Sequence, residues 1–200
     1  RDLADVNARS IDAEVALRSA LSGLGANNPL FGTPPASGSY NANNDPKLCY
    51  ASPLNGATTF NPLAQQLQTV ARLVQAAPAV EARRQVFFVG LGGFDTHDTQ
   101  NRNHAELMAK LAHALAYFDA TLGAMGKRNN VTLFTASDFG RTFTSNGDGT
   151  DHGWGAHHFV MGGAVRGGDL YGSFPTLGTK NANNNGFDSS PDQLGNGTLL

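Results

Sequence analysis

Two short apolar segments, separated by one long helical pattern, constrain the fold of this chain most. Residues 85–91 (Gln-Val-Phe-Phe-Val-Gly-Leu) form a nearly continuous apolar run, which predicts a strand buried on both faces. From about His104 to Met125 apolar residues recur at helical spacing, and residues 131–136 form a second apolar strand. A strand, a helix and a strand with short joints make a βαβ unit, so we expect two parallel strands and a right-handed crossover. The pattern therefore predicts an α/β fold.

The rest of the chain supplies helices and loops around this unit. Residues 2–24 have the apolar spacing of a helix, whereas residues 26–59 are rich in Asn, Gly, Pro and Ser and predict a long loop. A second helix is expected to begin at Asn61, a capping residue that is followed by proline. Residues 158–161 predict a third strand, and residues 179–198 predict a further loop. Loops of this length are typical of functional or lid-like segments.

Composition excludes several classes of function. Of the 200 residues, 40% are hydrophobic and 15% are charged, with a formal net charge of −2, so the chain can bury a core and has no basic block for a nucleic-acid partner. No apolar run approaches the roughly 20 residues of a membrane span. Cys49 is the only cysteine, which excludes an internal disulfide and a pair of thiolate ligands. The chain begins at Arg1 and ends at Leu200 without a signal peptide or a closing helix, which predicts an internal fragment or a processed product.

Side chains that can bind a metal follow the predicted strands. Asp95 and His97 come after the first strand, Asp138 comes after the second, and His152 lies in the loop beyond it. The carboxyl ends of parallel strands share one edge of a sheet, where α/β proteins bind their ligands. Carboxylate and imidazole ligands without cysteine suit Zn²⁺ or Mn²⁺ better than Ca²⁺. The sequence therefore predicts a divalent metal site formed by these four residues.

Each of these residues also has a purely structural interpretation. Asp95 could form an Asx turn beside an exposed His97, and Asp138 could cap the turn that follows it. Arg141 could clamp an anionic oxygen of a substrate, or it could pair with Asp138 or Asp148. The convergence of three separate loops favours the metal site for the aspartates and histidines. For Arg141 the two interpretations stay open.

Other polar residues near these loops are expected to have lesser roles. Asp151 could orient the imidazole of His152, but facing water is the favoured interpretation. Trp154 could form the wall of a pocket or anchor its loop, and both remain open. The remaining histidines are expected to be structural or on the surface: His104, His113, His157 and His158.

Four motifs, taken in order, resemble one bacterial family. They are Gly-Gly-Phe-Asp-Thr-His at 92–97, Ser-Asp-Phe-Gly-Arg-Thr at 137–142, Gly-Thr-Asp-His-Gly at 149–153 and Gly-Gly-Ala-Val-Arg-Gly-Gly at 162–168. The resemblance covers roughly residues 61–177. The family is the uncharacterised, typically exported domain of unknown function 1501, which is grouped with the alkaline phosphatase-like and sulfatase superfamily.

This resemblance implies a fold and a set of metal ligands. The superfamily fold is a three-layer α/β/α sandwich around a mostly parallel sheet, which would be incomplete in this chain. Asp95, His97 and His152 look like the ligands of one metal, and Asp138 looks like a ligand of a second. Superfamily phosphatases often have a histidine directly after the equivalent of Asp138, whereas this chain has Phe139.

The resemblance also implies a function. The parent protein would be a metal-dependent hydrolase of phosphate or sulfate esters that acts on a small anionic substrate, with Arg141 assisting on the anion. No N-terminal strand with the superfamily's nucleophile precedes Asn61, so the fragment is expected to lack that residue. The alternative is a non-catalytic domain, with a structural metal or none, that acts in binding or assembly. Glycan binding by the Asn/Gly-rich loops has support only from composition.

The sequence also predicts an organisation, and the resemblance predicts a location. We expect one domain in two parts: residues 1–60 with the first helix and the long loop, and residues 61–200 as the α/β half-domain with the metal site. A truncated parallel sheet would expose an edge strand, which predicts association with a missing segment or with another copy. The family resemblance places the protein outside the cytoplasm, in the periplasm or at the cell surface.

Overall fold

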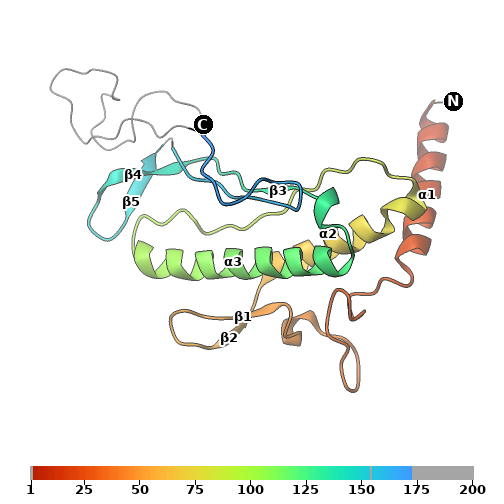
Figure 1. Ribbon diagram of the computed structural model, residues 1–200, viewed down its shortest axis with the longest axis horizontal. Coiled ribbons are helices and arrows are strands. Elements are labelled where there is room, and N and C mark those ends of the chain that lie inside the picture. The colour runs from red at the N-terminus through yellow and green to blue at the C-terminus, as the bar shows by residue number, and fades with distance from the viewer. Residues whose placement is uncertain (1, 154, 173–200) are drawn as a thin grey trace. The chain divides into compact units, whose positions relative to one another are not determined.

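The computed structural model describes residues 2–153 and 155–172 (Figure 1). The chain divides into two compact units. The first unit consists of residues 1–91 and 108–127, and the second contains the remaining residues. This division differs from the predicted segments 1–60 and 61–200, because the helix after residue 60 groups with the residues before it.

Two helices of the first unit agree with the expected pattern. Helix α1 (Asp2–Leu21) confirms the N-terminal helix, although its apolar side chains Val6, Ile11 and Val15 are exposed. Helix α2 (Pro62–Ala76) begins as predicted at Asn61, whose Oδ1 accepts hydrogen bonds from the backbone amides of the first turn. A 3-10 turn, η2 (Ala77–Val80), follows α2.

Helix α3 (Gln100–Ala124) contributes to both units and confirms the long helical pattern (Figure 1). It begins four residues before the expected start at His104, and Gly126, with φ +66°, follows its end. Its later turns pack in the core of the first unit. That core contains Phe31, Leu48, Leu63, Ala64, Leu67, Val70, Ala71, Ala114, Tyr117, Phe118 and Leu122.

The long loop at residues 26–59 is mostly irregular, as expected, but it is held around a buried carboxylate. It contains a 3-10 turn, η1 (Ala42–Asn44), and strand β1 (Cys49–Ala51), which pairs antiparallel with β2 (Thr58–Phe60). Asp45 is 2% exposed and accepts hydrogen bonds from the Thr33 amide, the Tyr40 hydroxyl and the Lys47 amide at 2.7–2.9 Å. Because these bonds join distant parts of the loop, they give it a fixed conformation without regular structure.

The prediction of a buried strand at residues 85–91 is wrong for the structure described. The segment has no strand pairing, and the side chains of Val86 and Phe88 are each 98% exposed. Its contact with the rest of the unit includes a pair of 2.9 Å hydrogen bonds between the Gln66 side chain and the Gly90 backbone. A strand needs a neighbouring strand to satisfy its backbone groups, and no described strand lies beside this one.

The expected parallel pairing of the second apolar segment is likewise not found. Residues 131–136 contain only the short strand β3 (Leu133–Phe134), which pairs antiparallel with β6 (Val160–Met161) instead. The predicted third strand is therefore present in shortened form as the partner of β3. Among the described residues every sheet is two-stranded and antiparallel. Because the βαβ unit is not formed, the three-layer α/β/α sandwich remains a prediction.

A β-hairpin is the main feature of the second unit. Strand β4 (Gly140–Ser145) pairs antiparallel with β5 (Thr150–Gly153) (Figure 1). In this pairing Arg141 lies opposite His152. The register shifts between Arg141 and Ser145, and residues 146–149 form the turn. A 3-10 turn, η3 (Arg128–Asn130), precedes β3. This hairpin brings His152 to the loop that contains Asp95.

Two further expectations concern membrane spans and the residues after position 153. No helix among the described residues is long and apolar enough to cross a bilayer. The loop predicted at residues 179–198 and Trp154 lie outside the described residues.

Candidate metal centre

The loop at residues 94–97 presents on the same side two side chains of types that can bind a metal. The Thr96 amide donates to the Phe94 carbonyl at 2.9 Å, and the Thr96 side chain is buried. Asp95 and His97, on either side of Thr96, are both exposed. Gly93 has a φ of +99°, a conformation that favours glycine, so it allows the sharp turn before the loop. The Asp-x-His spacing thus results from a turn whose middle residue points inward.

Strand β5 adds a second imidazole to this pair. The Nε2 atom of His152 lies 2.7 Å from Oδ1 of Asp95, and Nε2 of His97 lies 2.8 Å from the same oxygen. One ligand atom from each of the three residues lies within 4.8 Å of the other two. Three of the four predicted ligands therefore meet, from two segments more than fifty residues apart in sequence.

Two carboxylates lie beside the ring of His97. Nδ1 of His97 lies 3.1 Å from Oδ1 of Asp151, so both ring nitrogens of His97 face carboxylates. A neutral imidazole has one N–H only, and a carboxylate oxygen cannot donate to the other nitrogen. If Nδ1 donates to Asp151, then Nε2 of His97 needs either a second proton or a metal ion. The donor set and the Asp151 partner fit a divalent metal, because metal-binding histidines commonly donate their other N–H to a carboxylate.

The charges around Asp95 stabilise its ionised form. The hydrogen bond from His152 and the nearby charges of His97 and Arg141 hold the pKa of Asp95 below its usual value. The carboxylate is therefore ionised at neutral pH. Its side chain is 60% exposed, so a ligand can approach from solvent.

Arg141 contacts other groups than the two aspartates that were expected to pair with it. Its side chain is 17% exposed, and Nη2 donates to the Phe94 carbonyl and lies 3.4 Å from Asp95 Oδ1. Nη1 donates to the Thr150 carbonyl at 2.9 Å. Arg141 therefore ties the loop to β5 and supports Asp95, and neither Asp138 nor Asp148 is among its partners in the described part of the chain.

Aromatic packing holds the second imidazole. The ring of Phe139 stacks on His152 with a centroid distance of 4.0 Å and an interplanar angle of 3°. His152 in turn stacks on His97 at 5.0 Å and 27°, and the Arg141 guanidinium lies 5.1 Å from the Phe139 ring centroid. The sequence analysis did not identify this role for Phe139, because ring stacking depends on the hairpin register.

The structure does not bring Asp138 to the other three residues. Asp138 is exposed and is not part of the ligand group found among the described residues. Its neighbour Ser137 donates a hydrogen bond to the Phe139 carbonyl at 2.8 Å, so the serine supports this turn. The described geometry thus supports a single ion, and a second metal at Asp138 remains a prediction.

Comparison with known proteins now gives the family. A model for the family described as Protein of unknown function (DUF1501) matches residues 47–192, which includes all four motifs of the sequence analysis. The chain belongs to the DUF1501 family. No curated protein and no solved structure matches it.

The other histidines of this DUF1501 chain lie outside the ligand group. His157 and His158 are exposed just before β6, and His104 packs edge-on against Phe94 at 6.0 Å. The surface position predicted for His113 is wrong: its Nδ1 lies 3.1 Å from Asn61 Nδ2, and burial lowers its pKa. The helical pattern placed it on the exposed face because the packing of the irregular loop there could not be predicted.

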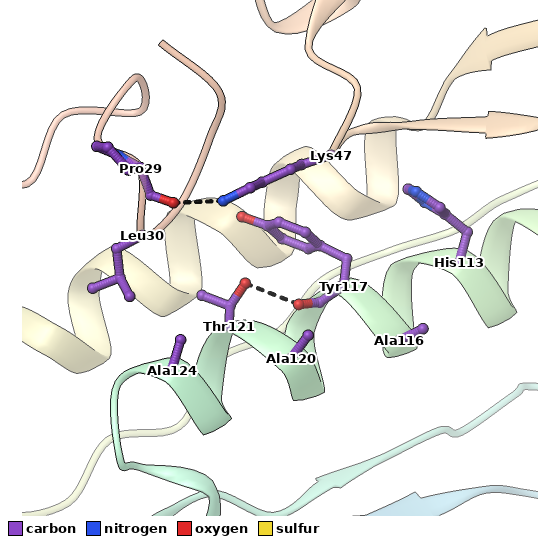
Figure 2. Close-up of a pocket in the computed structure, with 9 residues that line it drawn as sticks. All are labelled: Pro29, Leu30, Lys47, His113, Ala116, Tyr117, Ala120, Thr121 and Ala124. Atoms are coloured by element: carbon purple, nitrogen blue, oxygen red, sulfur yellow. Dashed lines mark hydrogen bonds between the residues drawn. The ribbon is translucent and has the colours of Figure 1, made fainter.

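The DUF1501 chain also has a cavity of about 370 Å³ in its first unit (Figure 2). Lys47 donates to the Pro29 carbonyl at its edge, and Tyr117 and Thr121 lie along α3. The lining residues are Pro29, Leu30, Lys47, His113, Ala116, Tyr117, Ala120, Thr121 and Ala124. None of the predicted metal ligands lines this cavity.

Proposed function

We propose that the Asp95–His97–His152 group is the metal site of a hydrolase that acts on phosphate or sulfate esters. The observation that carries this proposal is the approach of two imidazole Nε2 atoms to one carboxylate oxygen at 2.7–2.8 Å. The resemblance to the alkaline phosphatase-like and sulfatase superfamily supplies the reaction class. The substrate would be a small anionic ester.

The ligand types favour zinc or manganese. Two imidazoles with one carboxylate is a set that catalytic zinc sites use, with further positions left open for water or substrate. Mn²⁺ accepts the carboxylate more readily than the imidazoles. All three side chains are about half exposed or more, so a bound ion would have room for such a ligand.

A bound divalent ion would supply Lewis-acid chemistry at an ester oxygen. The protein's own groups have positioning roles around it. Asp151 fixes His97, Phe139 fixes His152, and Arg141 holds Asp95. Arg141 also adds positive charge beside the site, which favours the approach of an anionic substrate.

We extend this proposal to the fold and the location. Residues 85–91 have the composition of a central parallel strand, and pairing with a further segment or another copy would cover the exposed Val86 and Phe88. This supports the three-layer α/β/α sandwich of the superfamily. The superfamily resemblance also supports an exported protein of the periplasm or cell surface.

One observation favours a second candidate function, a non-catalytic domain with a structural metal. The guanidinium of Arg141 is already used by the carbonyls of Phe94 and Thr150, which leaves it few donors for a substrate anion. A metal at the same three residues would then serve to join the 94–97 loop to β5. Such a domain would act in binding or assembly.

Hydrolysis assays on the metal-loaded protein separate the two candidates. The parent protein, loaded with Zn²⁺ or Mn²⁺, is tested on 4-nitrophenyl phosphate and 4-nitrophenyl sulfate. We expect hydrolysis that is lost in His97→Ala and kept in Asp98→Asn, because Asp98 is exposed and outside the ligand group. Stoichiometric metal without hydrolysis of either ester contradicts the hydrolase and supports the structural metal. Full activity in His97→Ala contradicts both candidates.

A further inference from the structure

The β4–β5 hairpin contacts His97 at both its backbone, through Asn146 in the turn, and its ring, through Asp151 in β5. Nδ2 of Asn146 donates to the His97 carbonyl at 3.0 Å and to Oδ1 of Asp151 at 3.3 Å. The same Asp151 oxygen lies 3.1 Å from Nδ1 of His97. One amide group therefore links the main chain of a proposed ligand with the carboxylate that orients its imidazole.

The turn fixes the orientation of the Asn146 amide. Oδ1 of the Asn146 side chain accepts a hydrogen bond from the backbone amide of Gly149 at 3.0 Å. The backbone amide of Asn146 donates to the Gly149 carbonyl at 3.1 Å. A flipped side chain would place oxygen against the His97 carbonyl and the Asp151 carboxylate, so Nδ2 has to face them. The geometry itself determines which end of the amide donates.

Gly149 allows the turn to lie directly on the His97 backbone. A Cβ atom at Gly149 would lie 2.5 Å from the carbonyl carbon of His97 and 2.9 Å from the carbonyl oxygen of Thr96, which is too close for any side chain. Asp148, in the same turn, accepts from the Thr99 amide at 2.9 Å. The turn therefore contacts the backbone of residues 96–99 at several points.

We propose that Asn146 is a positioning residue for the metal site, acting on His97 through Asp151. The proposal rests on the metal site proposed above. Asn146 does not touch the ion: it holds the Asp151 carboxylate where it accepts from Nδ1 of His97, so that Nε2 points toward Asp95. Outer partners of this kind typically change metal affinity about 10- to 100-fold when they are removed.

The nearly isosteric change Asn146→Asp tests this role. It keeps the oxygen that accepts from Gly149 but replaces the donor with an oxygen that faces two acceptors. Zn²⁺ affinity is measured by competition with a chromophoric chelator. We expect Asn146→Asp to weaken Zn²⁺ binding about 10- to 100-fold. The matched control is Asn130→Asp, the same chemical change at an exposed residue of η3, which should bind Zn²⁺ like the wild type.

A second readout separates positioning from a general loss of stability. Long-range ¹H–¹⁵N correlation spectra of the metal-free chain report which ring nitrogen of His97 carries a proton. We expect the wild type and Asn130→Asp to show a protonated Nδ1, and Asn146→Asp to show an altered Nδ1 signal while its circular dichroism stays that of the folded protein. Where Asn146→Asp does not fold, Asn146→Ala, which removes the donor without adding charge, is expected to show the same changes.

Three results are decisive. Weakened Zn²⁺ binding together with an altered His97 Nδ1 signal supports the proposal. Unchanged affinity in a folded Asn146 variant overturns it and leaves the metal site intact. No Zn²⁺ binding by the wild type overturns the metal site, and the inference with it.

Discussion

Two carboxylates, one in each unit, show how similar hydrogen-bonding patterns can serve different purposes. Asp45 is buried and accepts from two backbone amides and the hydroxyl of Tyr40, none of which carries a charge at neutral pH. Asp95 is exposed and is approached by two imidazoles and a guanidinium. The partners of Asp45 fix the conformation of its loop, whereas the imidazoles beside Asp95 are proposed metal ligands.

The pKa values of the two groups are lowered for different reasons. Burial by itself raises the pKa of Asp45, but the hydrogen bonds from Thr33, Tyr40 and Lys47 outweigh it and hold the pKa below its usual value. For Asp95 the main cause is the hydrogen bond from His152, together with neighbouring positive charge. A lowered carboxylate pKa alone therefore does not identify a ligand site. What distinguishes Asp95 from Asp45 is the identity of its hydrogen-bond donors and its exposure to solvent.

The largest effect on Zn²⁺ affinity is expected from removing His152, one of the proposed ligands beside the exposed Asp95. His152→Ala takes away one of three metal-ligating atoms, so Zn²⁺ affinity should fall by more than the roughly 100-fold that loss of an outer partner causes. Isothermal titration calorimetry measures the change. His158→Ala is the matched control, because His158 is exposed and outside the ligand group. Equal Zn²⁺ binding by the two variants would remove the contrast between Asp95 and Asp45.

The buried carboxylate should affect stability instead. Asp45→Ala leaves the Tyr40 hydroxyl and two backbone amides without their acceptor, which should lower the free energy of unfolding by about 2–3 kcal/mol. Asp95→Ala, the same change at the exposed carboxylate, should leave it close to the wild-type value. Urea denaturation followed by circular dichroism compares them. The contrast fails if both variants unfold at the same urea concentration.

A smaller effect is expected at Phe139. Aromatic pairs contribute about 0.5–1.5 kcal/mol beyond their burial, so Phe139→Ala should weaken Zn²⁺ binding by about 10-fold at most, because His152 loses its stacked neighbour. Phe139→Tyr keeps the ring and should bind like the wild type. Chelator competition distinguishes them, and wild-type affinity in Phe139→Ala would show that stacking does not hold His152.

The smallest effect is a pH dependence in the first unit. Burial lowers the pKa of His113 in the folded state below its unfolded value, so folding favours the neutral ring. Stability should therefore be full above the model-peptide pKa of 6.5 and should decrease as the pH falls below that value toward the folded pKa. His113→Gln should reduce this dependence in urea denaturation measured from pH 7.5 to 5. A wild-type slope in His113→Gln would assign the dependence to other groups.

The helices could be predicted because their signals are local. Asn61 and the following proline mark the start of α2, and the spacing of Leu107, Phe118 and Leu122 marks the buried face of α3. Residues 85–91 could not be predicted in the same way. An apolar run indicates a strand only where neighbours pair with it, and pairing is not a property of the run itself.

The candidate site, like the fold, could be predicted only in part from the sequence. Asp95, His97 and His152 follow from ligand types in separate loops, and the structure brings them together. The partner of Asp151 is His97 and not the adjacent His152, because the fold brings a residue more than fifty positions earlier beside it, which the local sequence does not show. Asn146 and Phe139 have no sequence signal of metal chemistry, since their roles depend on the hairpin turn and on ring stacking.

Metal content tests the central claim most directly. The wild-type chain and the double variant Asp95→Asn/His97→Ala are dialysed against Zn²⁺ or Mn²⁺, freed of unbound metal and examined by plasma mass spectrometry. The Asp95–His97–His152 site predicts one ion per wild-type chain and none in the double variant. A metal-free wild type, or equal metal in both proteins, would contradict it.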